Sequence, residues 1–137
     1  MKRSEKLKNV LEKKRDTERI MTKPKSAKAK GRRLQNLVRD TLREVFHKLH
    51  PDDIKSQTMG MPGEDIVLSP AAREVIPYSF ECKNKERLDL WKSLEQALDN
   101  CGGRKPVLVI KRNRSRVYAV LEYDAFLDLI GEDNGKK

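Results

Sequence analysis

The sequence predicts an α/β fold in which a small mixed sheet is flanked by helices, in the order α-β-β-α-β-β-α. Two long segments, 32–49 and 88–100, place apolar residues at helical spacing, and short apolar runs such as 66–68 and 107–110 are typical of strands. The chain has 137 residues, of which 36% are hydrophobic and 38% are charged. These values favour one domain with a modest core and a charged partner.

The N-terminal segment is predicted to lie outside this domain. Residues 1–22 carry a few apolar residues at helical spacing among many Lys and Glu, so they can form a helix. Residues 23–31 contain Pro24, Gly31 and mutually repelling lysines, which indicate a flexible joint. We therefore expect a basic arm over residues 1–30, partly helical or flexible.

The folded domain is expected over residues 31–131, with a disordered tail at 132–137. Its first helix, 32–49, has one apolar stripe and should stop before Pro51, because proline disfavours a helical residue ahead of it. The stripe consists of Leu34, Leu37, Val38, Leu42, Val45, Phe46 and Leu49. A polar loop should then extend to Glu64.

Two strands are expected to follow this loop. Ile66–Leu68 forms the first, and residues 69–73 make the turn after it. Residues 74–83 form the second strand, in which Pro77 indicates an edge position or a bulge.

The C-terminal part is expected to be helix, two strands and a short helix. The helix at 88–100 should direct Leu88, Trp91, Leu94 and Leu98 inward, so Trp91 is interpreted as a packing residue. Strands are expected at 107–110 and 116–122. The turn between them carries Arg112, Arg114 and Arg116, which we expect at the far side of the sheet.

The last helix is expected to run from Asp124, as its N-cap, to Ile130. Gly131 should end it.

The positive charge of the chain is concentrated near its N-terminus. The net charge is +10, and residues 1–33 hold 14 of the 31 Lys and Arg but only 4 of the 21 Asp and Glu. Such basic segments bind polyanions through counterion release, so we expect a nucleic-acid partner. A solubilising tail and a membrane-surface role remain alternatives, although the segment offers little apolar area.

Other classes of protein are disfavoured. The basic N-terminal region is not followed by the apolar stretch of a secretory signal, and no run is long enough to span a bilayer. The two cysteines, Cys82 and Cys101, are expected to be reduced cytosolic thiols.

Two carboxylates and a lysine carry the chemistry that the sequence indicates. Strand alternation should place Glu81 and Lys83 on one face of 74–83, while Asp65 opens the preceding strand. Asp65 and Glu81 are oxygen ligands suited to Mg²⁺, and the backbone carbonyl of Cys82 is a third candidate. Lys83 would orient the attacking water or offset charge on a phosphate. The alternative is a solvated strand face with a surface ion pair.

The arrangement resembles the PD-(D/E)xK nuclease superfamily across residues 31–122, and most of all the archaeal-type Holliday junction resolvases and their phage relatives. Lys30–Gln35 stands where those enzymes have a Lys-Gly start and an acidic residue on the first helix. Ser56–Asp65 resembles their loop before the metal-binding Asp. Leu94–Ala97 resembles their helix with a Gln near the active site.

This resemblance implies a restriction-endonuclease-like core and a metal-dependent endonuclease that uses Mg²⁺, which Mn²⁺ can replace. Asp65, Glu81 and Lys83 would be catalytic, together with Gln35 and Gln96. The nucleic-acid contacts would come from Lys28, Lys30, Arg32, Arg33, Ser56 and Lys85.

The sequence departs from the family pattern at two positions. Glu64 replaces the proline before the metal-binding Asp, and it remains a rival ligand. The acid of the first helix is Gln35 here, which can bond a water or a phosphate but brings no charge. Glu44 does not substitute for Gln35, because nine residues of helix rotate its side chain by about half a turn, to the opposite side of the helix.

A four-way junction or other branched DNA is the substrate that the resemblance implies, in DNA recombination or repair. Cutting two strands symmetrically requires a two-fold homodimer, for which Val117–Leu121, Phe126, Leu127 and Ile130 are candidate surfaces. The expected location is the cytoplasm of a bacterium or phage-infected host, bound to DNA and not to a membrane.

Three alternatives remain open. A nuclease with the same site could act on flap, nicked or linear duplex DNA. A basic nucleic-acid-binding protein could keep this fold without catalysis. An RNA-binding accessory factor could use the basic arm alone.

Overall fold

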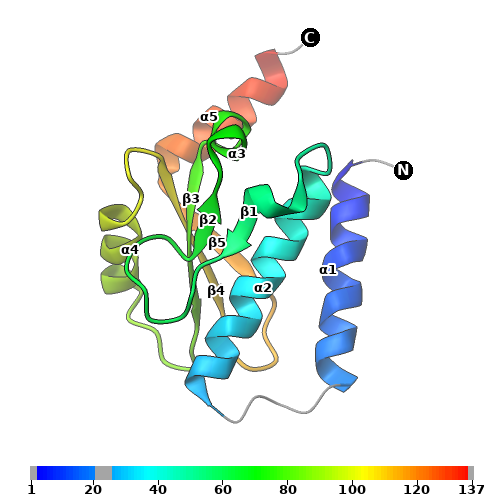
Figure 1. Cartoon of the computed structure of the whole chain (residues 1–137), viewed down its shortest axis with the longest axis vertical. Coiled ribbons are helices and arrows are strands. Elements are labelled where there is room, and N and C mark those ends of the chain that lie inside the picture. The colour runs from blue at the N-terminus through cyan, green and yellow to red at the C-terminus, as the bar shows by residue number, and fades with distance from the viewer. Residues whose placement is uncertain (1–2, 21–25, 136–137) are drawn as a thin grey trace.

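The structure is a computed structural model that describes residues 3–20 and 26–135 (Figure 1). It confirms a mixed α/β fold with small sheets flanked by helices. The elements are α1 (Arg3–Ile20), α2 (Ala27–Val45), the 3-10 helix η1 (Pro51–Asp53), β1 (Ile54–Ser56), β2 (Ile66–Leu68), α3 (Pro70–Val75), β3 (Tyr78–Asn84), α4 (Leu90–Asp99), β4 (Lys105–Lys111), β5 (Tyr118–Leu121) and α5 (Tyr123–Gly135).

The strands form two small sheets. The larger sheet has the order β3-β4-β5, with β3 parallel to β4 and β4 antiparallel to β5. The smaller sheet pairs β1 with β2 in antiparallel fashion, with Lys55 opposite Val67. β3 is thus an edge strand of the larger sheet. This agrees with the edge position indicated by Pro77, although the strand begins only after that residue.

The hydrophobic core lies between α2 and the strands. Leu34, Leu37 and Val38 of α2 are buried against a group that includes Ile54, Ile66, Leu68, Ile76, Cys82, Val107 and Val109. α4 covers the sheet on the side opposite α2 (Figure 1). One face of β3 therefore packs on α2, and the other looks toward α4.

Helix α2 begins earlier than the sequence indicated. Ser26 is its N-cap and its hydroxyl accepts a hydrogen bond from the Ala29 amide at 3.1 Å, so residues 27–31 are helical and not part of a flexible joint. Residues 21–25 of that expected joint lie outside the described residues. The helix ends at Val45, and the chain turns before Pro51, which starts η1.

Residues 69–73 do not form a simple turn. They open the short helix α3, because the Ser69 hydroxyl accepts from the Ala72 amide and Pro70 occupies the first helical position. The preceding loop also contains a strand that the sequence did not reveal. Only Ile54 of the three residues in β1 is apolar, which is too little pattern to predict a strand.

The predicted inward face of α4 was wrong at Trp91 and Leu98, while Leu88 and Leu94 are half-buried. Trp91 is 75% exposed and Leu98 is also exposed, whereas the small residues Ser93 and Ala97 are buried against the sheet. Small side chains allow the helix backbone to approach the sheet closely. Trp91 is therefore not a core residue.

Helix α5 continues through Gly131 to Gly135, so residues 132–135 of the expected tail are helical. Ala125 is its buried residue, while Phe126, Leu127 and Ile130 are exposed. These three residues do not close the core of the monomer.

Helix α1 confirms the helical interpretation of the N-terminal segment and lies beside α2 (Figure 1). Leu7 and Val10 line a groove together with Phe46, Leu49 and Val75. This groove lies at the C-terminal end of α2. No described helix is long and apolar enough to cross a membrane.

Candidate metal and catalytic site

Asp65 is fixed to the free edge of β3 by two hydrogen bonds. Its amide donates to the Phe80 carbonyl at 3.1 Å, and its carboxylate Oδ2 accepts from the Cys82 amide at 2.6 Å. The loop behind it is tied as well, because the Gln57 amide donates to the Asp65 carbonyl at 2.8 Å. The carboxylate is thus placed beside residues 81–83, although only three residues of β2 follow it.

Glu81 and Lys83 lie on one face of β3, as strand alternation predicted. Lys83 Nζ lies 3.8 Å from Glu81 Oε2, and both side chains are largely buried. On the other side of the Glu81 carboxylate, Asn100 Nδ2 donates to Oε1 at 3.5 Å. The lysine and the helix α4 C-cap therefore hold this carboxylate from two directions.

Gln35 joins the site from α2. Its side-chain amide lies close enough to the Asp65 carboxylate to lower the pKa of that group, and the residue is buried among the apolar residues of the helix. Gln35 Oε1 is a buried acceptor without a hydrogen-bond partner among the described residues. A buried acceptor of this kind costs about 1–3 kcal/mol unless a donor or a cation satisfies it.

The backbone of Cys82 also faces Asp65. In a strand, the N–H and C=O of one residue point toward the same edge. Because the Cys82 amide donates to Asp65, its carbonyl points to the same free edge of β3. The structure thus places the carbonyl that the sequence suggested as a metal ligand on the Asp65 side of the strand.

Burial makes the two carboxylates costly to ionise together. Desolvation, followed by the nearby Asp65 charge, raises the pKa of Glu81 from 4.5 to about 7, against the opposing effects of Lys83 and Asn100. Desolvation also raises the pKa of Asp65, while the Cys82 amide, Lys83 and Gln35 oppose the shift. Burial raises the pKa of the Cys82 thiol as well, so this side chain stays protonated.

Glu64, the rival ligand, is engaged elsewhere. Its carboxylate is hydrogen-bonded to the guanidinium of Arg104 and lies 4.0 Å from Arg73 Nη2. The Glu64 and Arg104 side chains are both mostly buried. The ion pair therefore anchors the residue before Asp65 and leaves Asp65 as the carboxylate at the β3 edge.

The donor set fits a hard divalent cation such as Mg²⁺. Asp65, Glu81, the Cys82 carbonyl and the unsatisfied Gln35 Oε1 are all oxygen donors, which is the chemistry that Mg²⁺ prefers. The set contains two acids, and no group of three or more His, Cys, Asp or Glu side chains suited to a metal occurs among the described residues. Neutral oxygens would have to complete the coordination.

Gln96 is exposed on α4, whereas Asn100, one helical turn later, reaches Glu81. Asn100 was missed because nothing in its sequence context distinguishes it from a helix-ending polar residue. Glu44 is exposed in the last turn of α2 and lines the groove beside α1, in agreement with its exclusion.

The residues predicted to bind nucleic acid are spread over two regions. Lys28 and Arg32 are exposed near the start of α2, with Lys30 and Arg33 half-buried beside them. Lys85 is exposed just beyond β3. Ser56 lies in β1, where its hydroxyl donates to Asn36 Oδ1 at 3.0 Å.

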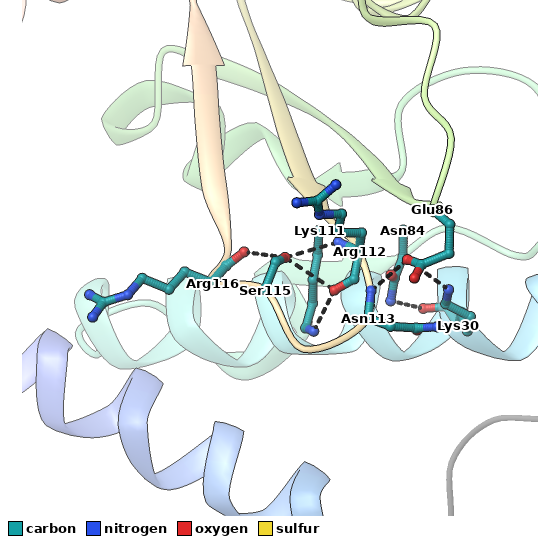
Figure 2. A network of polar contacts seen from close by, with 8 residues as sticks. All are labelled: Lys30, Asn84, Glu86, Lys111, Arg112, Asn113, Ser115 and Arg116. Atoms are coloured by element: carbon teal, nitrogen blue, oxygen red, sulfur yellow. Dashed lines mark hydrogen bonds and ion pairs between the residues drawn. The ribbon is translucent and has the colours of Figure 1, made fainter.

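The turn after β4 is not remote from these residues, contrary to the expectation. Asn113 in this turn donates its amide to Glu86, which pairs with Lys30 on α2 (Figure 2). The turn and the start of α2 therefore border the same end of the sheet.

Comparison of the chain with protein-family models, curated proteins and solved structures found no match.

The raised pKa of Glu81 predicts a pH-dependent effect of the Glu81→Gln substitution. The folded protein binds this proton more tightly than the unfolded chain, so ionisation of Glu81 lowers the free energy of unfolding as the pH rises from about 4.5 to about 7. In the presence of chelator, the free energy of unfolding of Glu81→Gln minus that of the wild type should increase between these pH values, by up to about 3 kcal/mol. Above pH 7 this difference should stay constant.

Urea unfolding at closely spaced pH values measures this difference. Glu95→Gln, at an exposed position of α4, is the matched control and should show no such trend. A stability difference for Glu81→Gln that does not change between pH 4.5 and 7 would contradict the burial of an ionised Glu81.

Proposed function

We propose that the protein is a metal-dependent DNA endonuclease of the PD-(D/E)xK type, acting on branched DNA. The observation that carries the proposal is the meeting of Asp65, Glu81 and Lys83 at one strand edge, beside the unsatisfied Gln35 Oε1. A cation-binding site explains both the paired carboxylates and that acceptor.

The arrangement of elements supports the same class. A helix, α2, precedes the strands that carry the acids and the lysine, and a helix and a parallel strand, α4 and β4, follow them. This is the order that the superfamily resemblance implies for a restriction-endonuclease-like core. The missing third acid is the main departure, and Gln35 occupies its place on the first helix.

Asp65 and Glu81 would hold Mg²⁺, with the Cys82 carbonyl and Gln35 Oε1 as neutral oxygen donors. When bound, the cation supplies charge relief on the phosphate and lowers the pKa of water. Lys83 provides a positive charge 3.8 Å from Glu81, where it can donate to a water or to a phosphate oxygen. Asn100 and the Glu64–Arg104 pair keep the two carboxylates in position.

Four-way junction DNA is the substrate class that we favour, cleaved by a homodimer. The dimer proposal is supported by α5, whose Phe126, Leu127 and Ile130 are exposed although they are apolar. β5, which directly precedes α5 in the chain, is an edge strand of the three-stranded sheet. Flap, nicked or linear duplex DNA are the alternative substrates of the same site.

One observation favours a second function, a non-catalytic basic protein that binds nucleic acid. The site has only two acids, and Lys83 can neutralise part of their charge without a cation. The catalytic experiment below separates the two functions.

Purified protein should cleave a labelled four-way junction in Mg²⁺ and not in chelator. Asp65→Asn, Glu81→Gln and Lys83→Ala should each lower the cleavage rate by about 100-fold or more, because the first two weaken binding of the cation and the third removes the positive charge next to the phosphate. Gln35→Ala should lower it less. Gln35→Glu should cleave at least as fast as wild type, because it supplies the acid that the superfamily resemblance implies at this position.

The control is Glu95→Gln, which should cleave at the wild-type rate. Linear, nicked and flap substrates run in parallel identify the preferred DNA. Retained junction binding without cleavage by the wild type, in either Mg²⁺ or Mn²⁺, would favour the non-catalytic function.

The exposed face of α5 predicts the effect of a charge on self-association. Each buried Leu or Ile contributes about 1.5–3 kcal/mol, so Leu127→Asp and Ile130→Asp should each weaken the dimer by at least about tenfold. Light scattering across a dilution series measures the dissociation constant. Leu98→Asp, at an exposed apolar position of α4, should leave it unchanged. A monomeric wild type would contradict the proposed dimer.

A further inference from the structure

Two basic segments are joined beyond the end of β3. The first is Lys85–Arg87, which leaves β3, and the second is Lys111–Arg116, which ends β4 and forms the turn to β5. The Lys85 amide donates to the Lys111 carbonyl at 3.0 Å, and the Asn113 amide donates to Glu86 Oε2 at 2.7 Å. Figure 2 shows Glu86 directed toward this turn.

The start of α2 is attached to the same place. Glu86 Oε2 lies 3.9 Å from Lys30 Nζ, and Asn84 Nδ2 donates to the Lys30 carbonyl at 3.0 Å (Figure 2). Three segments distant in sequence therefore meet in one region beyond the end of β3, where their basic side chains point in several directions (Figure 2). We call this region the basic rim and define it by Lys28, Lys30, Lys85, Arg87, Lys111, Arg112, Arg114 and Arg116.

The turn is held in a fixed conformation. Ser115 Oγ accepts from the Arg112 amide at 3.0 Å, and the Ser115 amide donates to the Arg112 carbonyl at 3.2 Å. Arg114 has a φ of 61°, a left-handed conformation that costs a non-glycine residue about 1 kcal/mol. These hydrogen bonds constrain the exposed turn that carries the Arg114 side chain. The backbone conformation alone would favour glycine at this position.

The arginines of this turn are not neutralised by neighbouring acids. Arg112, Arg114 and Arg116 are exposed, and none of them lies within 4.0 Å of a carboxylate in the described part of the chain. Glu86 is the acid within the joined segments, and it is already bonded to Lys30 and the Asn113 amide. The rim is therefore a preorganised surface with surplus positive charge.

The rim lies along the same strand as the candidate site. Lys85 is four residues beyond Glu81 in the same chain direction, or about 13 Å at the rise of a strand. Duplex DNA rises about 3.4 Å per base pair, so this spacing corresponds to roughly four base pairs. A duplex arm whose phosphate sits at Asp65 and Glu81 can extend its backbone over the rim.

We propose that the basic rim binds the phosphate backbone of a DNA duplex about four base pairs from the phosphate that is cut. The inference rests on the proposed function, and it adds a binding surface outside the metal site. Duplex DNA is favoured over a peptide or a lipid because the rim presents spaced charges on a constrained frame and no large apolar side chain. The contacts would set the register of the DNA without reading its sequence.

Binding is measured with the Asp65→Asn protein in chelator, so that no cleavage occurs, using a labelled four-way junction at several salt concentrations. Log affinity falls linearly with log salt concentration, and each phosphate contact adds about 0.9 to the steepness of this fall. In this background, Arg112→Gln with Arg114→Gln should make the salt dependence less steep by about 2 and weaken binding at least tenfold. Lys48→Gln with Lys105→Gln removes the same charge, beyond the C-terminal end of α2 and at the first residue of β4. This control should change neither quantity comparably.

Arg114→Gly tests charge against loop structure. Glycine relieves the left-handed backbone, so thermal stability should stay level or rise, while the salt slope falls by about 1. Reduced stability with an unchanged slope would overturn the inference and assign Arg114 a structural role.

The outcomes for the two proposals are distinct. Tight junction binding that the Arg112 and Arg114 variants do not affect overturns the rim alone. Rim-dependent binding by a wild-type protein that cuts no DNA overturns the nuclease proposal, and with it the spacing from a cut phosphate, but keeps the rim as a duplex-binding surface. Preferential binding of duplex RNA, or no binding to either nucleic acid, overturns both.

Discussion

Two hydrogen bonds between Asp65 and β3 are the constraint on which the candidate site depends. The Asp65 amide and carboxylate bond to Phe80 and Cys82, where an additional strand would otherwise pair with the free edge of β3. The short β2 strand cannot fix its position by ladder pairing with β3. The aspartate supplies that link itself, and in doing so it brings its carboxylate beside Glu81.

This link concentrates charge in a buried place, and the surrounding residues limit the cost. Lys83 and Asn100 contact Glu81, while Gln35 and the Cys82 amide contact Asp65. Even so, desolvation raises the pKa of both carboxylates, so the site gains from a proton or a cation. A purely structural role would be served by apolar residues at lower cost. This imbalance is the physical argument for a functional site.

The sequence predicted the elements with strong periodic patterns and the alternation within β3. It placed Glu81 and Lys83 on one face, and the helices that it placed at 32–49 and 88–100 are observed as α2 (Ala27–Val45) and α4 (Leu90–Asp99). It failed where local capping and tertiary contacts decide the outcome. Ser26 extends α2 into the expected joint, Ser69 turns a predicted loop into α3, and close packing of Ala97 leaves Trp91 in solvent.

The candidate site shows the same division. Asp65 and Glu81 were chosen from strand pattern together with the resemblance to a nuclease superfamily. The contact of Glu64 could not be predicted, because its partner Arg104 lies 40 residues away. Asn100 and the contact between the turn after β4 and the start of α2 are likewise tertiary features. Single-sequence periodicity contains no signal for contacts between such distant segments.

The central claim is that Asp65 and Glu81 bind a divalent cation in the folded protein. Titration of Mn²⁺ into the full chain, followed by electron paramagnetic resonance, measures that binding without any nucleic acid or cleavage. We expect a site that Mg²⁺ competes for, that is lost in Asp65→Asn and Glu81→Gln, and that persists in Glu64→Gln. Equal Mn²⁺ binding by wild type and the Asp65→Asn and Glu81→Gln variants would contradict the account.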